Sequence, residues 1–189
     1  MTKDYKNLSL KEIIAEAEAI SQEAQERFLP LNHEQMNWKS NPETWSIAQC
    51  FDHLIVTSNS YFPQFDRIIE GKKTTTLQSL PFLPAFWGRL LINALSPNSK
   101  GKFKATQPFQ PASSKIDPQI ISKFAAQQNE LIGKIRATEG RAPERVIIRS
   151  PVLKFMTYSL LDAYRIIVVH ERRHFKQAQR VMEAPGFPM

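Results

Sequence analysis

The sequence predicts an all-α protein, a four-helix bundle with a long crossover between its second and third helices. Apolar residues recur at steps of three and four in four long segments, which is the period of a helix with one buried face. No segment shows a convincing strand pattern. A chain of 189 residues is long enough for one domain with a substantial core, so we expect residues 1–189 to form a single domain.

The first two helices have recognisable ends. The first is predicted over residues 9–28, with a proline soon after its end. The polar stretch 31–45 indicates a turn region. The second helix is predicted to begin at Ser46, which has a glutamine three residues on in a capping-box pattern. It is expected to kink at Pro63 and to stop at Gly71.

A proline-rich connection over residues 72–116 separates the second and third helices. Its length is unusual for a compact domain and indicates a crossover that travels along the bundle, with one short helix at 85–95. The third helix is predicted to begin at Asp117 and Pro118, because aspartate caps a helix well and proline suits its first turn. It is expected to stop near Gly140.

The fourth helix is predicted to begin with Thr157 as its N-cap and to run to Glu183. The preceding "RVII", residues 145–148, has the composition of a short extended piece, but an isolated strand has no predicted partner. His170 and His174 both lie on the predicted inward face of this helix. Because they are four residues apart, their side chains point the same way.

Two stacked imidazoles in a core are costly without hydrogen-bond partners or a metal. His53 falls at the edge of the apolar stripe of the second helix, which can face the fourth helix across a bundle. Three histidines from two facing helices would form a three-nitrogen site with positions left open for water or substrate. The alternative is a set of polar core residues with ordinary partners. His33, in the turn region, is expected at the surface.

Glu171 completes an H-E-x-x-H string with the two histidines, a pattern known from zinc proteases. Those enzymes need a third ligand downstream and use the glutamate as general base. No histidine follows His174, and no sheet is predicted that would hold a peptide. The protease hypothesis is therefore disfavoured. Glu171 is more economically a residue of the helix surface or one that supports a metal ligand, and it remains a candidate catalytic base.

Charge and cysteine content narrow the function classes. The formal charge is +7, but basic residues are scattered among acidic ones and no aromatic and basic platform is evident, so no nucleic-acid partner is expected. No apolar run reaches the roughly 20 residues of a membrane span, and none follows Met1 as a signal peptide would. The single cysteine, Cys50, fits a reducing compartment, and we expect a cytoplasmic protein.

Two motifs together resemble the DinB superfamily of DinB/YfiT-like metalloenzymes. "NWKSNPETWSIAQCFDHL" resembles its W-x-x-x-x-x-x-W-S-I-x-(E/Q)-x-x-x-H-L signature, and "VVHERRHFKQAQRVM" resembles its H-x-x-R-H-x-x-Q signature. The stretch "FKATQPFQPAS" is similar to the family's crossover. One departure is Gln49, which stands where many members carry glutamate, and a neutral amide cannot act as a carboxylate base.

The resemblance implies that His53, His170 and His174 bind a divalent metal, zinc or nickel. It implies an enzyme with thiol S-transferase-type or hydrolase chemistry on a small-molecule substrate, in which the ion stabilises a thiolate or hydroxide. A low-molecular-weight thiol would then be a co-substrate. The alternative is a non-catalytic metal- or small-ligand-binding bundle.

Three further features have two interpretations each. The family is often dimeric, and the apolar stretch "LPFLPAFWGRLLINAL", residues 80–95, would serve a homodimer or pack on its own bundle. Trp45 would line the mouth of the site or act as a hydrophobic staple. Arg173 and Lys176 would steer an anionic thiol or form a solvated helix face.

Overall fold

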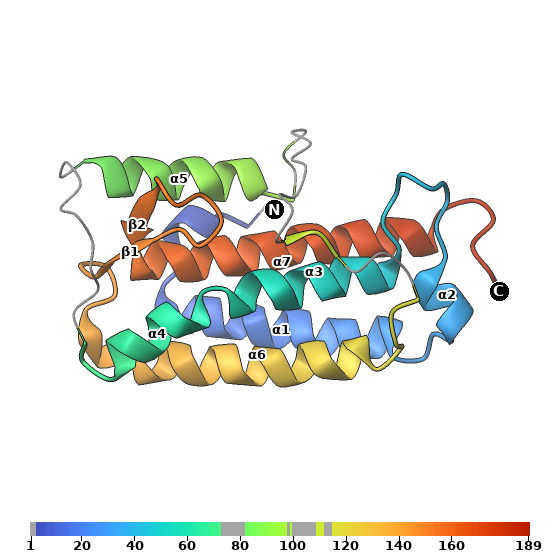
Figure 1. The fold of residues 1–189 in the computed structure, drawn as a ribbon, viewed down its shortest axis with the longest axis horizontal. Coiled ribbons are helices and arrows are strands. Elements are labelled where there is room, and N and C mark those ends of the chain that lie inside the picture. The colour runs from blue at the N-terminus through green and yellow to red at the C-terminus, as the bar shows by residue number, and fades with distance from the viewer. Residues whose placement is uncertain (1–2, 73–81, 98, 100–108, 112–114) are drawn as a thin grey trace.

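The computed structural model describes residues 3–72, 82–97, 99, 109–111 and 115–189, and the chain is predominantly helical (Figure 1). The predicted all-α class is confirmed. The helices are α1 (Leu10–Phe28), α2 (His33–Asn37), α3 (Ile47–Asn59), α4 (Phe62–Ile69), α5 (Leu83–Leu95), α6 (Ile120–Ala137) and α7 (Leu160–Met182). Two 3-10 turns, η1 (Tyr5–Asn7) and η3 (Glu139–Arg141), and two strands, β1 (Ile147–Arg149) and β2 (Thr157–Ser159), complete the elements.

Four helices pack around a core that consists of two hydrophobic clusters. α1 contacts α6 and α7, and α3 contacts the same two helices, so the four form a ring in the order α1, α6, α3, α7. Their axes run side by side in Figure 1, with α4 continuing beyond α3 and packing on α6. α5 lies outside this ring, against α7 and β2. This added helix confirms the short helix predicted at 85–95; the rest of the predicted crossover lies largely outside the described residues.

Local capping starts α1 and α3 where the sequence predicts. The Ser9 hydroxyl accepts a hydrogen bond from the Glu12 amide, and the Glu12 carboxylate accepts one from the Ser9 amide, which starts α1. Ser46 and Gln49 form the same reciprocal capping box at α3. Each box satisfies two amides that a helix start would otherwise leave without partners. The start of α3 in turn sets the rotation and height of the residues that follow along this helix.

Two predicted helix boundaries are wrong. The second predicted helix is two helices, since α3 ends at Asn59 and α4 begins at Phe62. Pro63 lies in the first turn of α4, where its missing N–H breaks no hydrogen bond. The third helix begins at Ile120 rather than at Asp117, whose carboxylate instead accepts a hydrogen bond from the Gln119 amide, 2.9 Å away, in the turn before α6.

The segment before the last helix also differs from the prediction. Residues 147–149 of "RVIIR" form β1, which pairs antiparallel with β2. Thr157 therefore lies in a strand, opposite Arg149, and does not cap the helix. Ser159 caps α7 instead, by accepting a hydrogen bond from the Asp162 amide at 3.0 Å. The predicted turn region 31–45 likewise contains the short helix α2.

Candidate metal centre

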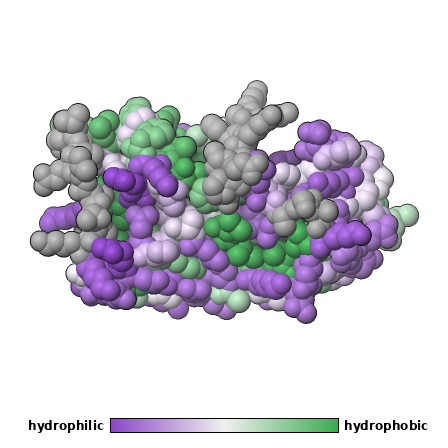
Figure 2. Space-filling view, in the orientation of Figure 1, coloured by the Kyte–Doolittle hydropathy of each residue, from purple (hydrophilic) through white to green (hydrophobic). Residues whose placement is uncertain are grey.

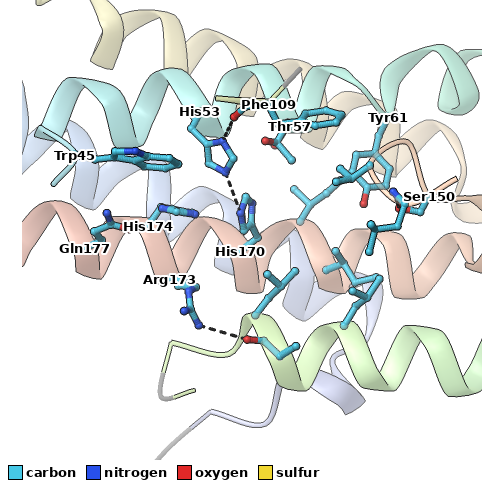
Figure 3. Close-up of a pocket in the computed structure, with 18 of the residues that line it drawn as sticks. Trp45, His53, Thr57, Tyr61, Phe109, Ser150, His170, Arg173, His174 and Gln177 are labelled. Carbon is cyan, nitrogen blue, oxygen red and sulfur yellow. Dashed lines mark hydrogen bonds between the residues drawn. The ribbon is translucent and has the colours of Figure 1, made fainter. Parts of the chain in front are cut away.

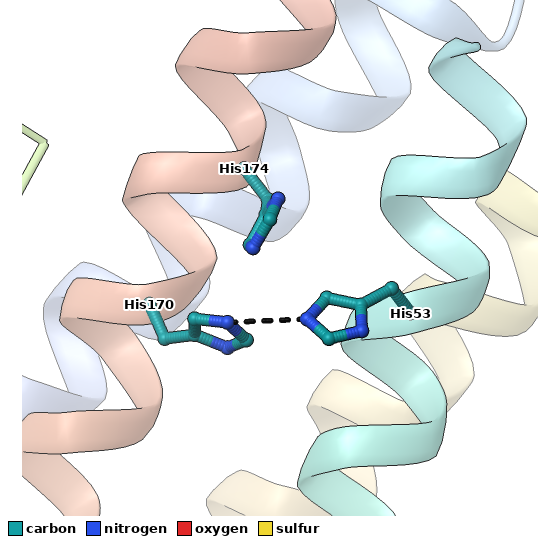
Figure 4. Close-up of side chains that lie close together, drawn as sticks. All are labelled: His53, His170 and His174. Carbon is teal, nitrogen blue, oxygen red and sulfur yellow. Dashed lines mark hydrogen bonds between the residues drawn. The ribbon is translucent and has the colours of Figure 1, made fainter. Parts of the chain in front are cut away.

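Three histidines from two facing helices lie together (Figure 4). His53 comes from α3, and His170 and His174 come from the middle of α7, one turn apart. One ring nitrogen from each lies within 4.8 Å of those of the other two. The ring centroids are 4.6–5.0 Å apart. The contact between α3 and α7 thus brings residues 117 positions apart in the sequence into one cluster.

A backbone carbonyl determines which nitrogen of His53 carries the hydrogen. The Nδ1 atom lies 2.5 Å from the carbonyl oxygen of Phe109. A carbonyl only accepts hydrogen bonds, so Nδ1 is the donor and Nε2 is left with a free lone pair in the neutral ring. This Nε2 points at Nε2 of His170, 3.2 Å away (Figure 3). A second ring nitrogen held by a carbonyl is the usual arrangement around a histidine that binds a metal.

Burial keeps the three imidazoles neutral. His53 and His174 are buried, and His170 is partly buried where it faces the cavity. Burial lowers the pKa of His53 against the opposing effect of the Phe109 carbonyl. It lowers the pKa of His174 to about 3, with the neighbouring His53 and Arg173 acting in the same direction. Burial, followed by the other two histidines, holds the pKa of His170 well below its ordinary value.

These residues fit a divalent metal ion. Neutral imidazoles are the form that binds a metal, and three of them leave positions open for other ligands. Nδ1 of His174 is buried and has no hydrogen-bond partner among the residues that the structure describes. Nε2 of His53 has a free lone pair and faces Nε2 of His170, and no carboxylate lies between these two atoms. An unpartnered buried nitrogen is unfavourable unless a ligand or water completes it.

The cluster opens into a cavity of about 790 Å³. α7 forms its floor, and α3 and α5 form its two side walls (Figure 3). Trp45, just before α3, stands over the histidines at one end. Its ring stacks on His174, with centroids 5.4 Å apart, and lies 4.9 Å from the ring of His53. Trp45 therefore lines the mouth of the site, one of the two roles considered for it from the sequence.

A profile of the DinB superfamily matches residues 16–178, which include all three histidines. The chain belongs to the DinB superfamily. No curated protein and no solved structure matches it significantly. In the part of the chain that the structure describes, no helix is long and apolar enough to cross a membrane.

Glu171 does not join the histidines in this DinB superfamily protein. It is fully buried, and its Oε1 accepts hydrogen bonds from Gln128 of α6, at 2.7 Å, and from Ser58 of α3, at 3.2 Å. Consecutive helix residues point about 100° apart, which directs Glu171 into the bundle core while His170 faces the cavity. Burial raises the pKa of Glu171 to about 7, against the effect of these two donors.

The other residues considered from the sequence lie in different parts of the fold. Arg173 lines the cavity, but its guanidinium donates to the carbonyl oxygens of Ala94 and Ser96 and so ties α7 to the end of α5. Lys176 is exposed on the outer face of α7, as is His33 on α2. Gln49 serves the capping box of α3, so the position where relatives carry glutamate has a structural role here.

Two contributors to the site were not found from the sequence. The Phe109 carbonyl is a backbone atom, and its side chain gives no sign of this role; its only signal is that it lies in the stretch "FKATQPFQPAS". Thr57 follows His53 by one turn of α3 and lines the cavity. Its spacing from His53 was visible in the sequence, whereas the burial of its hydroxyl without a hydrogen bond to any described residue depends on the packing.

Proposed function

We propose that this DinB superfamily protein is a divalent-metal-dependent enzyme that acts on a small molecule at His53, His170 and His174. One observation carries the proposal: three neutral imidazoles on two packed helices converge at the floor of a cavity of about 790 Å³. This volume lies within the range of small-molecule sites. The chemistry we propose is of the thiol S-transferase or hydrolase type.

The three histidines would hold the ion, zinc or nickel, both of which imidazole ligands suit. When bound, such an ion acts as a Lewis acid. It lowers the pKa of a low-molecular-weight thiol or a water, so that the thiol or water is a nucleophile at neutral pH. The Phe109 carbonyl fixes the ring of His53 with Nε2 directed at the cluster. Trp45 covers His174 and keeps bulk water from this side of the site.

The positions of the carboxylate side chains favour a second candidate function. In it the protein is a non-catalytic bundle that binds a metal or a small ligand. Of the described residues that line the cavity, Glu43 alone carries a carboxylate, and it is exposed at the mouth beside Trp45. Glu171 is bonded within the core. No carboxylate among the described residues therefore stands beside the histidines as a general base, and an enzyme would need water or the thiol itself to carry the proton.

We also propose that the protein forms a homodimer through the outer face of α5. Figure 2 shows apolar atoms gathered over this helix. Phe82, Phe86 and Leu90 follow one another at steps of four along α5, with 83%, 56% and 43% of their surface exposed. Such a stripe is more than a monomer ordinarily leaves in water. Sedimentation equilibrium of the wild type and of Phe86→Glu tests the proposal, which fails if both are monomers.

The first experiment on the function is metal analysis by mass spectrometry of protein purified without an affinity tag or chelator. The wild type is expected to hold about one divalent ion per chain, and the His170→Ala/His174→Ala double variant is expected to hold none. His33→Ala, which changes the exposed histidine of α2, is the matched control and should retain the ion. An empty wild type after incubation with zinc, nickel or manganese would refute the metal site. Loaded protein without turnover in a thiol-transfer and hydrolysis screen would favour the binding bundle.

A further inference from the structure

The cavity continues along α7 well past the three histidines, and its far part is lined by hydrocarbon. Ile166 and Ile167 of α7 form the floor there. Leu91 of α5 forms one wall, and Ala94 lies where this wall reaches the histidine end, since its carbonyl accepts a hydrogen bond from Arg173. Leu153 and Met156, from the loop between β1 and β2, close the far end. We name these six residues the apolar compartment. Figure 3 shows the arrangement, with the histidines toward one end and Tyr61 and Ser150 at the other.

The hydroxyl groups that border the apolar compartment are already bonded to the protein. The Tyr61 hydroxyl lies 2.8 Å from that of Tyr158. Ser150 accepts a hydrogen bond from the Leu153 amide at 3.0 Å, and Ser58 donates to Glu171 at 3.2 Å. A polar ligand group placed here would lose its water without gaining a free partner from these hydroxyls, which is unfavourable.

The polar group that lacks a partner lies at the histidine end. Oγ1 of Thr57 is buried and makes no hydrogen bond with any described residue. Thr57 follows His53 by one turn of α3, and both residues line the cavity (Figure 3). A buried hydroxyl is ordinarily satisfied, so a ligand or water is the partner that this wall requires. The cavity therefore offers an unpartnered hydroxyl and the histidine nitrogens at one end, and at the other methyl and methylene groups bordered by hydroxyls that are bonded to the protein.

We infer that the substrate is an amphiphile whose alkyl or aryl portion fills the apolar compartment, while its polar reacting group lies against the histidines and the Thr57 hydroxyl. This inference rests on the proposed function, since it names the substrate class of the same site. It disfavours sugars and other molecules that are polar along their whole length, because most of the far part is hydrocarbon and the hydroxyls that border it are already bonded to the protein.

The test is calorimetric titration with three straight-chain carboxylates, hexanoate, octanoate and decanoate. Each is titrated into chelator-treated protein and into zinc-loaded protein. Burial of one methylene is expected to increase the affinity by about fourfold, so each step of two carbons should tighten binding by roughly fifteenfold in both preparations until the compartment is full. Affinity that does not depend on chain length in either preparation overturns the inference.

Two variants on the same helix locate the bound chain. Ala94→Trp places an indole at the histidine end of the apolar compartment, where it is expected to block the bound chain and abolish the dependence on chain length. Ala85→Trp makes the same change at an exposed position of α5 and should bind as the wild type does. Equal chain-length dependence in both variants would show that the hydrocarbon binds elsewhere, which overturns the inference.

Thr57→Val keeps the shape of the side chain and removes the hydroxyl. It tests the inference independently if a tryptophan variant does not fold. We expect it to weaken all three carboxylates by the same factor and to leave the effect of chain length unchanged. A loss of chain-length dependence in Thr57→Val contradicts the assigned orientation. If chain length matters in chelator-treated protein and zinc neither binds nor alters affinity, the apolar compartment stands and the metal-dependent function fails.

Discussion

Gly88 sets how closely α5 approaches α7, and Gly88→Ala tests that contact. A Cβ atom at this position would lie 2.5 Å from Oδ2 of Asp162, 2.9 Å from its Cγ and 3.1 Å from its Cβ. Asp162 is not free to move away, because its Oδ1 accepts a hydrogen bond from Arg165 at 2.9 Å. Arg165 is itself held by two hydrogen bonds to the Leu8 carbonyl, of 2.9 and 2.8 Å. Added volume must therefore separate the two helices or break this network.

Two opposing effects determine the size of the change. Alanine in place of glycine within a helix stabilises it by about 1 kcal/mol. Overpacking of a close contact costs about 1–3 kcal/mol. Gly133→Ala isolates the first effect, because Gly133 lies within α6 and a Cβ there meets no atom within 4 Å. We therefore expect Gly88→Ala to have a free energy of unfolding about 1–3 kcal/mol below that of Gly133→Ala.

Urea unfolding followed by circular dichroism measures both variants beside the wild type, and thermal unfolding gives a second readout. A difference of 1 kcal/mol corresponds to about 2–4 °C in Tm for a chain of this size. The reasoning is refuted if Gly88→Ala is stabilised as much as Gly133→Ala, since α5 and α7 would then have room at their crossing. The consequence reaches the cavity, because this contact holds the wall that α5 provides.

Three other predictions use different readouts. Zinc at a hundredfold excess over its Kd should stabilise the wild type and His33→Ala by about 2.7 kcal/mol and leave His53→Ala unchanged in Tm; equal shifts in all three would exclude His53 as a ligand. Burial raises the pKa of Glu16, but the hydrogen bond from Lys3 and the ion pair with Arg172 outweigh it and lower the pKa below its ordinary value. The stability from this group is thus present above the ordinary carboxyl pKa and is lost as the pH falls through the lower folded-state value. Glu16→Gln should show a shallower loss of unfolding free energy between about pH 6 and pH 3, and an unchanged slope would contradict the assignment. Burial raises the pKa of the Cys50 thiol to about 12, so a disulfide reagent at pH 8 should modify it only as fast as the protein opens; rapid modification of native protein would show that Cys50 is accessible.

The helices and the histidine pair follow from contacts that are local in the sequence. The capping boxes at Ser9 and Ser46 involve residues three positions apart, so the pattern of letters contains both partners. The spacing of His170 and His174 equals one turn of a helix, which fixes their common direction once the segment is helical. This is why the fold class and a facing pair of imidazoles could be predicted without knowledge of the packing.

Errors occurred where a distant partner overrides the local signal. Thr157 is of a residue type that often caps helices. Its backbone instead pairs with Arg149 of β1, eight residues upstream. Glu171 was considered as a residue of the helix surface, yet it is fully buried and accepts hydrogen bonds from Ser58 and Gln128 within the core. In both cases the competing hydrogen bond comes from an element whose position depends on the whole fold.

The sequence alone therefore established an all-α chain, the two signatures and three candidate ligands, because periodicity and capping act over a few residues. The tertiary structure decided that His53 meets the α7 pair and that the Phe109 carbonyl orients it. It also decided that the Thr57 hydroxyl is buried without a hydrogen-bond partner among the described residues. The tertiary structure also forms the apolar compartment, because its walls come from three segments that are far apart in the chain. A helix's own period fixes which side chains share a face, but only the packing of helices on one another fixes what that face meets.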